Sequence, residues 1–116
     1  MGVIRNAGGR ATPDVVTSIT ALRTLADVKG VFVVHHTDCG MTHMTDEEIR
    51  KEAKRRTPDA AEDVDGVDGY GCFKAEEFEE TIRKDVEKLR GEKVLGGLVV
   101  RGLAFDLDDG VVRVVE

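Results

Sequence analysis

The sequence predicts an α/β fold in which a mostly parallel β-sheet is flanked by helices and ends in a C-terminal hairpin. Three observations carry this prediction. A valine-rich apolar run follows a glycine, as in strands buried on both faces of a parallel sheet. Segments with apolar residues at helical spacing alternate with the apolar runs, which favours helices packed on that sheet. The pair Asp109-Gly110 stands between two apolar runs and indicates a hairpin turn.

The first strand and helix are expected within the first 28 residues. Residues 2–4 form a short apolar run that leads into a glycine-rich turn at 5–9, so we expect a strand there. Thr12 is the expected N-cap of a helix, with Pro13 at the first helical position. Apolar residues at helical spacing extend this helix to about Val28.

The next strand and helix are expected on either side of a turn at residues 35–40 that is rich in polar side chains. Residues 31–34 are a continuous apolar run, typical of a buried strand, and lead directly into residues 35–40. Thr45 and Glu48 have the spacing of a capping box, which predicts a helix beginning at Thr45. Pro58 ends that helix.

The C-terminal half is expected to hold one long helix and a hairpin. Residues 59–72 carry five acidic side chains and no basic one, so a solvated loop is expected. Residues 75–89 place their apolar side chains on one helical stripe. A strand is expected over 98–105, followed by the turn and a second strand at 111–115. We expect residues 1–116 to form a single domain, because this length is typical of one.

Composition excludes several classes of function. The formal net charge of −6 argues against nucleic acid as a partner, since nucleic-acid proteins present a basic surface. No apolar run approaches the length of a membrane helix, so no membrane partner is expected. Two cysteines without a visible secretory signal indicate reduced thiols, and hence a cytoplasmic protein.

His36 and Cys39 are the strongest candidates for chemistry. They follow a predicted parallel strand, and ligands in α/β proteins bind beyond the carboxyl ends of such strands. Imidazole nitrogen and thiolate sulfur are both zinc ligands, and a His-x-x-Cys turn lets them converge on one ion. On spacing alone, a partly buried cysteine beside a loop histidine is the favoured explanation of the pair. His35 is expected to point to the opposite face of the strand in a structural role.

Two segments of the chain, in the same order as in a known family, resemble the motifs of that family. Residues 3–8 read Val-Ile-Arg-Asn-Ala-Gly, and residues 35–41 read His-His-Thr-Asp-Cys-Gly-Met after a helix and an apolar strand. In this the chain closely resembles the β-class carbonic anhydrases, and residues 73–106 also look like that family. The resemblance implies zinc, one ion per chain, and the reversible hydration of carbon dioxide to bicarbonate.

The resemblance also implies roles for individual residues. His36 and Cys39 match two zinc ligands of the family. Other positions match the loop and turn that shape its substrate cleft: Arg5, Asn6, Ala7, Gly8, Asp38 and Gly40.

One family motif has no counterpart in the sequence. In the family, a Cys-x-Asp-x-Arg motif on an upstream strand supplies another zinc ligand and an Asp–Arg pair. Only Met1–Ile4 stand before the Arg-Asn-Ala-Gly segment here, so we expect an N-terminally truncated member with impaired activity and can assign no catalytic residue. Cys72 is the only other thiol and the candidate substitute ligand. As a small apolar residue beside Phe73, it also has a structural explanation.

The missing strand bears on partners and function. In the family it lies near the middle of the sheet, and unpaired strand edges invite association, so we expect a homodimer or higher oligomer. The enzyme hypothesis keeps zinc on His36 and Cys39 and completes the site with a substitute ligand. The alternative is a catalytically inactive truncated paralogue acting as an oligomerising or metal-binding module. A third interpretation is that these residues belong to a longer chain, which the codons before Met1 would reveal.

Overall fold

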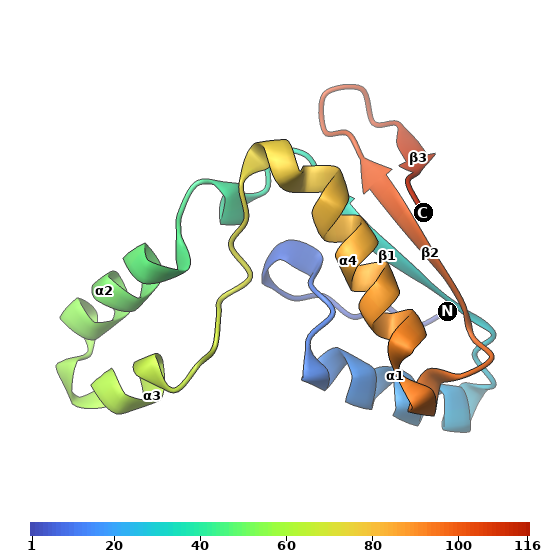
Figure 1. The fold of residues 1–116 in the computed structure, drawn as a ribbon, viewed down its shortest axis with the longest axis horizontal. Coiled ribbons are helices and arrows are strands. Elements are labelled where there is room, and N and C mark those ends of the chain that lie inside the picture. Colours follow the sequence, from blue (N-terminus) through green and yellow to red (C-terminus); the bar gives the residue numbers. More distant parts are fainter.

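The computed structural model describes residues 1–116 and contains a small mixed sheet with helices packed against it (Figure 1). Short 3₁₀ turns join several of the elements. The helices and strands are α1 (Pro13–Ala26), β1 (Gly30–His36), α2 (Asp46–Arg56), α3 (Ala61–Asp65), α4 (Phe78–Gly91), β2 (Val99–Phe105) and β3 (Val112–Val114). None of the helices has the length and apolar character needed to cross a membrane.

The sheet has the order β1-β2-β3. β1 and β2 are parallel, with Gly30 opposite Val99 and His36 opposite Phe105. β3 returns antiparallel to β2 after the turn that contains Gly110, whose φ of 71° requires the conformational freedom of glycine. The α/β class, the parallel pair and the C-terminal hairpin are therefore confirmed.

One face of the sheet packs against α4 to form the core. The apolar stripe of α4 is fully buried at Ile82, Val86 and Leu89, as its helical spacing predicts. Gly102 of β2 lies directly beneath it: a Cβ there would lie 2.5 Å from Ile82 Cγ2. Glycine at this position thus allows α4 to approach the sheet closely.

The other face of the sheet carries no helix. Phe32 of β1 and Val114 of β3 are exposed to 66% and 69%. We call this surface the open sheet face; the apolar side chains on it come from all three strands: Phe32, Val34, Val99, Leu103, Phe105, Val112 and Val114.

The prediction of a strand at residues 2–4 is wrong. Residues 1–5 make no backbone hydrogen bond, and Val3 is 71% exposed. An extended segment becomes a strand only when a neighbour pairs with its backbone, and no neighbour lies beside this one. β1, the nearest strand, has β2 on one side and no strand on the other.

The prediction of a solvated loop over 59–72 is wrong for its first part. Pro58–Ala60 forms a 3₁₀ turn that leads into the short helix α3. The sequence predicts that Pro58 ends the preceding helix. In the structure Pro58 also begins the next helical segment, where its fixed φ is favourable. Acidic Glu62 and Asp63 fall in the first turn of α3, where the helix dipole favours negative charge.

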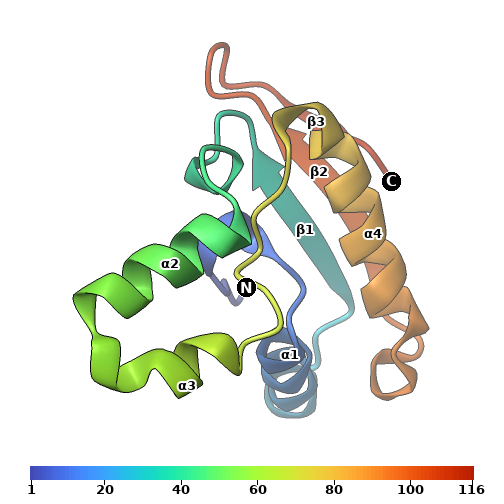
Figure 2. The ribbon, with the colours of Figure 1, turned by 60° about the vertical axis from the view of Figure 1, so that its left-hand side comes forward.

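α2 and α3 form an arm that projects away from the sheet and α4 (Figure 2). No residue of either helix is buried. Polar contacts hold the arm together: Lys54 Nζ lies 2.8 Å from Asp65 Oδ1, and Arg50 donates to the carbonyls of Val67 and Asp68. We call residues 46–70 the helical arm.

Candidate metal site and substrate cleft

The His-x-x-Cys turn lies at the carboxyl end of β1, where the sequence places it. His36 is the last residue of β1. Thr37 anchors the turn to the end of β2, because its N–H donates to the Phe105 carbonyl and its hydroxyl accepts from the Leu107 N–H. Asp38 follows with a φ of 50° and turns the chain back so that Cys39 is buried.

His36 has one ring nitrogen available for a ligand. Its Nδ1 lies 2.8 Å from the Thr37 carbonyl oxygen, and a carbonyl can only accept, so Nδ1 carries the proton. In the neutral imidazole the lone pair is then on Nε2, which makes no hydrogen bond within the chain. Metal-binding histidines are commonly oriented by this kind of backbone hydrogen bond from the other nitrogen.

The residues present supply only part of a zinc site. A neutral imidazole and a thiol are donors that zinc prefers, but a catalytic site normally has three protein ligands and a water. Among the 116 residues, no group of three or more His, Cys, Asp or Glu side chains is placed to hold a metal ion. The chain by itself therefore does not fit a complete catalytic zinc site.

Cys72 lies near this turn but is engaged elsewhere. The next residue, Phe73, donates its N–H to the Met41 carbonyl, which brings the segment close to the turn. The backbone N–H of Cys72 donates to Asp46 Oδ1 at 3.2 Å. Burial, and then the hydrogen bond of its thiol to Asp46, raise the pKa of Cys72 to about 11. Without a metal, Cys72 is therefore a neutral thiol at pH 7.

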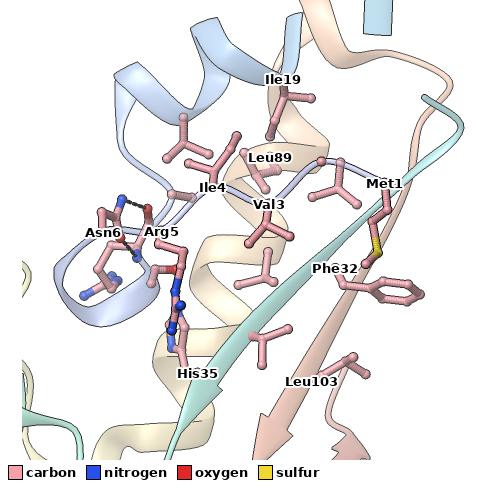
Figure 3. A pocket seen from close by; sticks show the side chains of 18 of the residues that line it. Met1, Val3, Ile4, Arg5, Asn6, Ile19, Phe32, His35, Leu89 and Leu103 are labelled. Atoms are coloured by element: carbon pink, nitrogen blue, oxygen red, sulfur yellow. Dashed lines mark hydrogen bonds between the residues drawn. The ribbon is translucent and has the colours of Figure 1, made fainter. Parts of the chain in front are cut away.

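The Arg5–Gly8 segment forms a loop closed by Asn6. Asn6 Oδ1 accepts from the Arg10 N–H at 2.8 Å, and its Nδ2 donates to the Arg10 carbonyl at 2.9 Å (Figure 3). Gly8 and Gly9 have φ of 80° and 65°, which fold the loop tightly.

A cavity of about 1000 Å³ adjoins this loop, and only some of the predicted cleft residues line it. Three of the six, Arg5, Asn6 and Gly8, do so, and so does the predicted metal ligand His36. Figure 3 labels Arg5 and Asn6. The other predicted site residues, Ala7, Asp38, Cys39, Gly40 and Cys72, lie outside its lining. The exposed Asp38 contacts His43 Nε2 at 2.8 Å, and Gly40 is also exposed. The structure thus brings half of the predicted cleft together around one cavity.

A buried polar network supports the loop from behind. Asp85 of α4 binds Arg10 through both carboxylate oxygens, at 2.8 and 3.1 Å, and accepts from the Ala11 N–H. His35, 2% exposed, lies 3.3 Å from the same carboxylate, and its Nε2 lies 3.0 Å from the Gly9 carbonyl. The expectation that His35 points to the face opposite His36 is confirmed.

Asp85 was not found by sequence reasoning. Burial opposes its charged form, but the hydrogen bonds from His35 and Arg10 outweigh burial and lower its pKa to about 2. The available signal was its position: Asp85 falls on the apolar stripe of α4, between Ile82 and Val86. A carboxylate on a buried helical face needs a partner, and here that partner is Arg10.

Comparison with known proteins agrees with this fold. No protein-family profile matches the chain. It is 37% identical over 73 residues to beta-carbonic anhydrase 1 of Mycobacterium tuberculosis, an alignment that covers 53% of this chain and 45% of that protein. It is 43% identical over 49 residues to carbon disulfide hydrolase of an Acidianus species, covering 42% of this chain and 24% of that protein.

A solved structure extends the likeness to almost the whole chain. Carbonic anhydrase from Streptococcus mutans superposes with a TM-score of 0.83 and 31% identity over 97% of this chain. The superposition spans 65% of that chain, and the curated relatives are matched over less than half of their length. From the shared fold and the sequence identity, we conclude that this chain is a β-carbonic anhydrase-like protein.

Proposed function

We propose that this chain contributes His36 and Cys39 to a zinc site for the reversible hydration of carbon dioxide to bicarbonate. The third protein ligand then lies outside these 116 residues. The observation that carries the proposal is the state of His36: its Nδ1 is held by the Thr37 carbonyl and its Nε2 is free, on the same turn as Cys39. Thiolate ligation needs a reduced Cys39, so the proposal places the protein in the cytoplasm.

The residues of the cleft suit a small uncharged substrate and an anionic product. The cavity beside His36 is lined mainly by apolar side chains, which favour a neutral molecule such as carbon dioxide. Arg5 provides the positive charge that bicarbonate requires at the same end. Asn6, with its amide bonded on both sides to the backbone of Arg10, holds Arg5 and the loop in place.

Metal content and turnover, measured together, test the proposal. Zinc per chain is determined by mass spectrometry, and carbon dioxide hydration by stopped flow with a pH indicator. We expect weak zinc binding that is lost in His36→Ala and Cys39→Ser, tighter binding when a small thiol is added as third ligand, and no turnover in the isolated chain. Two protein ligands leave the metal site incomplete.

Cys72→Ser is the matched control for this experiment. We expect it to bind zinc as the unchanged chain does, because both the thiol and the backbone N–H of Cys72 are hydrogen-bonded to Asp46. One tightly bound zinc together with turnover, both lost in Cys72→Ser, would instead make Cys72 the substitute ligand.

A catalytically inactive oligomerising or metal-binding module is the competing function. The absence of any three-ligand cluster among the 116 residues favours it. Absence of zinc binding, even with added thiol, would support an inactive module that binds no metal. Zinc binding without turnover would support a metal-binding module, provided that turnover is also absent when a third ligand, from a longer chain or an added thiol, completes the site.

Carbon disulfide is a second substrate to test, because 49 residues of this chain are 43% identical to a carbon disulfide hydrolase. Carbon dioxide and carbon disulfide are both linear and uncharged, and the mainly apolar lining of the cavity suits either molecule. Hydrogen sulfide release from carbon disulfide and hydration of carbon dioxide, both measured on a longer chain that supplies the third zinc ligand, decide between the two substrates.

The open sheet face supports a homodimer or higher oligomer. Its seven apolar side chains belong to all three strands and have no helix over them. Exposed contiguous apolar surfaces of this kind mark sites of protein association. We place the contact between two copies of the chain on this face.

A further inference from the structure

The cavity of about 1000 Å³ is much larger than carbon dioxide requires. Cavities of this volume enclose drug-sized molecules, whereas carbon dioxide is triatomic. The space extends along β1, and the N-terminal segment and α1 line it together with that strand (Figure 3). A ligand that fills the cavity is therefore larger than the proposed substrate and elongated.

The two ends of the cavity differ in chemistry. The loop that carries Arg5 lies at the carboxyl end of β1, since the Gly9 carbonyl oxygen is 3.0 Å from His35 Nε2. The other end lies where β1 begins and is lined by the apolar side chains of Leu22 and Val28. Apolar side chains of the N-terminal segment, α1 and β1 line the space between: Val3, Ile4, Val15, Ile19, Val31 and Val33.

The lining carries positive charge that is not compensated. No Asp or Glu side chain lines the cavity, although the chain contains 23 of them. Arg10 is held by Asp85 through both carboxylate oxygens. Arg5 makes no hydrogen bond or ion pair within the chain, so its guanidinium is available to an anion. The lining therefore suits a molecule with an anionic group at one end and an apolar remainder.

We propose that the cavity binds a free long-chain fatty acid, with its carboxylate on Arg5 and its alkyl chain along β1 towards Val28. A carboxylate matches the fork of donors on a guanidinium. The seven residues of β1 span ~23 Å at ~3.3 Å per residue, which accommodates an extended palmitate chain. Binding needs no metal, so this inference goes beyond the proposed function and is tested independently of it.

A series of fatty acids of increasing length tests the alkyl end of the proposal. Octanoate, laurate and palmitate, each below its micelle concentration, displace a fluorescent fatty acid from the metal-free chain. We expect the affinity to rise by about tenfold for each two methylene groups added, because each enters an apolar space. Equal affinities for octanoate and palmitate would overturn the proposal.

Val28→Phe locates the end of the alkyl chain. Val28 is half-buried and lines the end of the cavity that is distant from Arg5. A larger side chain there shortens the cavity, so we expect palmitate to lose about tenfold in affinity while laurate binds as before. Thermal unfolding of the variant establishes that the fold is retained. An equal loss for both fatty acids would contradict the orientation that we propose.

Arg5→Gln tests the carboxylate end. We expect it to weaken palmitate binding by about fivefold, since the carboxylate loses its ionic partner at a solvent-accessible position. Lys51→Gln is the control: it removes the same charge from an exposed position on α2, outside the cavity, and is expected to leave the affinity unchanged.

The methyl ester of palmitate separates charge from hydrophobicity, because it keeps the alkyl chain and removes the anion. We expect it to bind less tightly than palmitate to the unchanged chain and equally to the unchanged chain and Arg5→Gln. An ester that binds as tightly as the acid would show that Arg5 does not recognise a carboxylate. Absence of palmitate binding to the folded chain would overturn the inference as a whole and leave the proposed zinc chemistry untouched.

Discussion

Asp85 shows how one buried charge organises the loop beside the cleft. Its carboxylate accepts from Arg10, His35 and the Ala11 N–H, and so joins α4 to β1 and to the loop that precedes α1. A charge on a buried helical face is stable only with such partners, and removing one partner leaves the other uncompensated. The position of Arg5 and Asn6 therefore depends on a residue of α4 that never touches the cleft.

Asp85→Asn is expected to lower the free energy of unfolding at neutral pH by about 3 kcal/mol, because Arg10 loses its buried partner. The folded pKa of about 2 lies below the ordinary 3.8, so the charged Asp85 stabilises the fold above pH 4. This contribution, about 2 kcal/mol, is lost as the pH falls from about 5 towards 2.

Urea unfolding at neutral and acidic pH measures this effect. The difference between Asp85→Asn and the unchanged chain is expected to shrink with acidification, whereas Asp63→Asn, at an exposed position, changes little at any pH. A difference that is the same at pH 7 and pH 3 would show that Asp85 does not titrate as described.

At the scale of elements, α2 is stabilised by its own sequence rather than by packing. Thr45 accepts from the Glu48 N–H at 3.1 Å, three acidic residues fill the first turn, and three basic residues fill the last. Each of these features complements the helix ends. Since no residue of α2 is buried, the N-cap and the charged residues at its ends, and not packing, stabilise this helix of the arm.

Thr45→Ala is expected to destabilise α2 by about 1 kcal/mol, because the Glu48 N–H loses its acceptor. The effect should stay within the helical arm: amide exchange accelerates in Asp46–Arg56 and remains unchanged in α4. Thr45→Ser, which keeps the hydroxyl, is expected to restore slow exchange. An equal acceleration in α4 would mean that the arm unfolds together with the core.

At the scale of the whole molecule, the open sheet face is the surface on which the oligomer prediction depends. Val112→Lys combined with Val114→Lys places two charges on it, where both side chains are more than half exposed. We expect the mass in solution to fall from that of a dimer to that of a monomer at micromolar concentration. The fold is retained because these side chains point away from α4.

Val111→Lys is the matched variant, since Val111 is as exposed as Val112 but precedes β3 in the turn. It is expected to leave the mass unchanged. A monomer mass for the unchanged chain, measured by solution scattering at micromolar concentration, would end the homodimer proposal.

Much of the local structure could be predicted from sequence because its causes are local. The capping box at Thr45, the apolar stripe of α4, the buried run of β1 and the turn at Gly110 each depend on residues a few positions apart. The His-x-x-Cys turn was located for the same reason: a buried strand predicts where its own carboxyl end lies.

The sequence by itself thus determined the class of fold, the order of its main elements, and the presence of His36 and Cys39, two side chains of the kinds that bind zinc, on one turn. Only the tertiary structure decided that residues 2–4 stay unpaired, that Asp85 binds Arg10, and that no third ligand reaches His36 and Cys39. The physical reason is common to all three. A strand, an ion pair and a metal site each need a partner distant in sequence, and only the packed chain shows which partners are within reach.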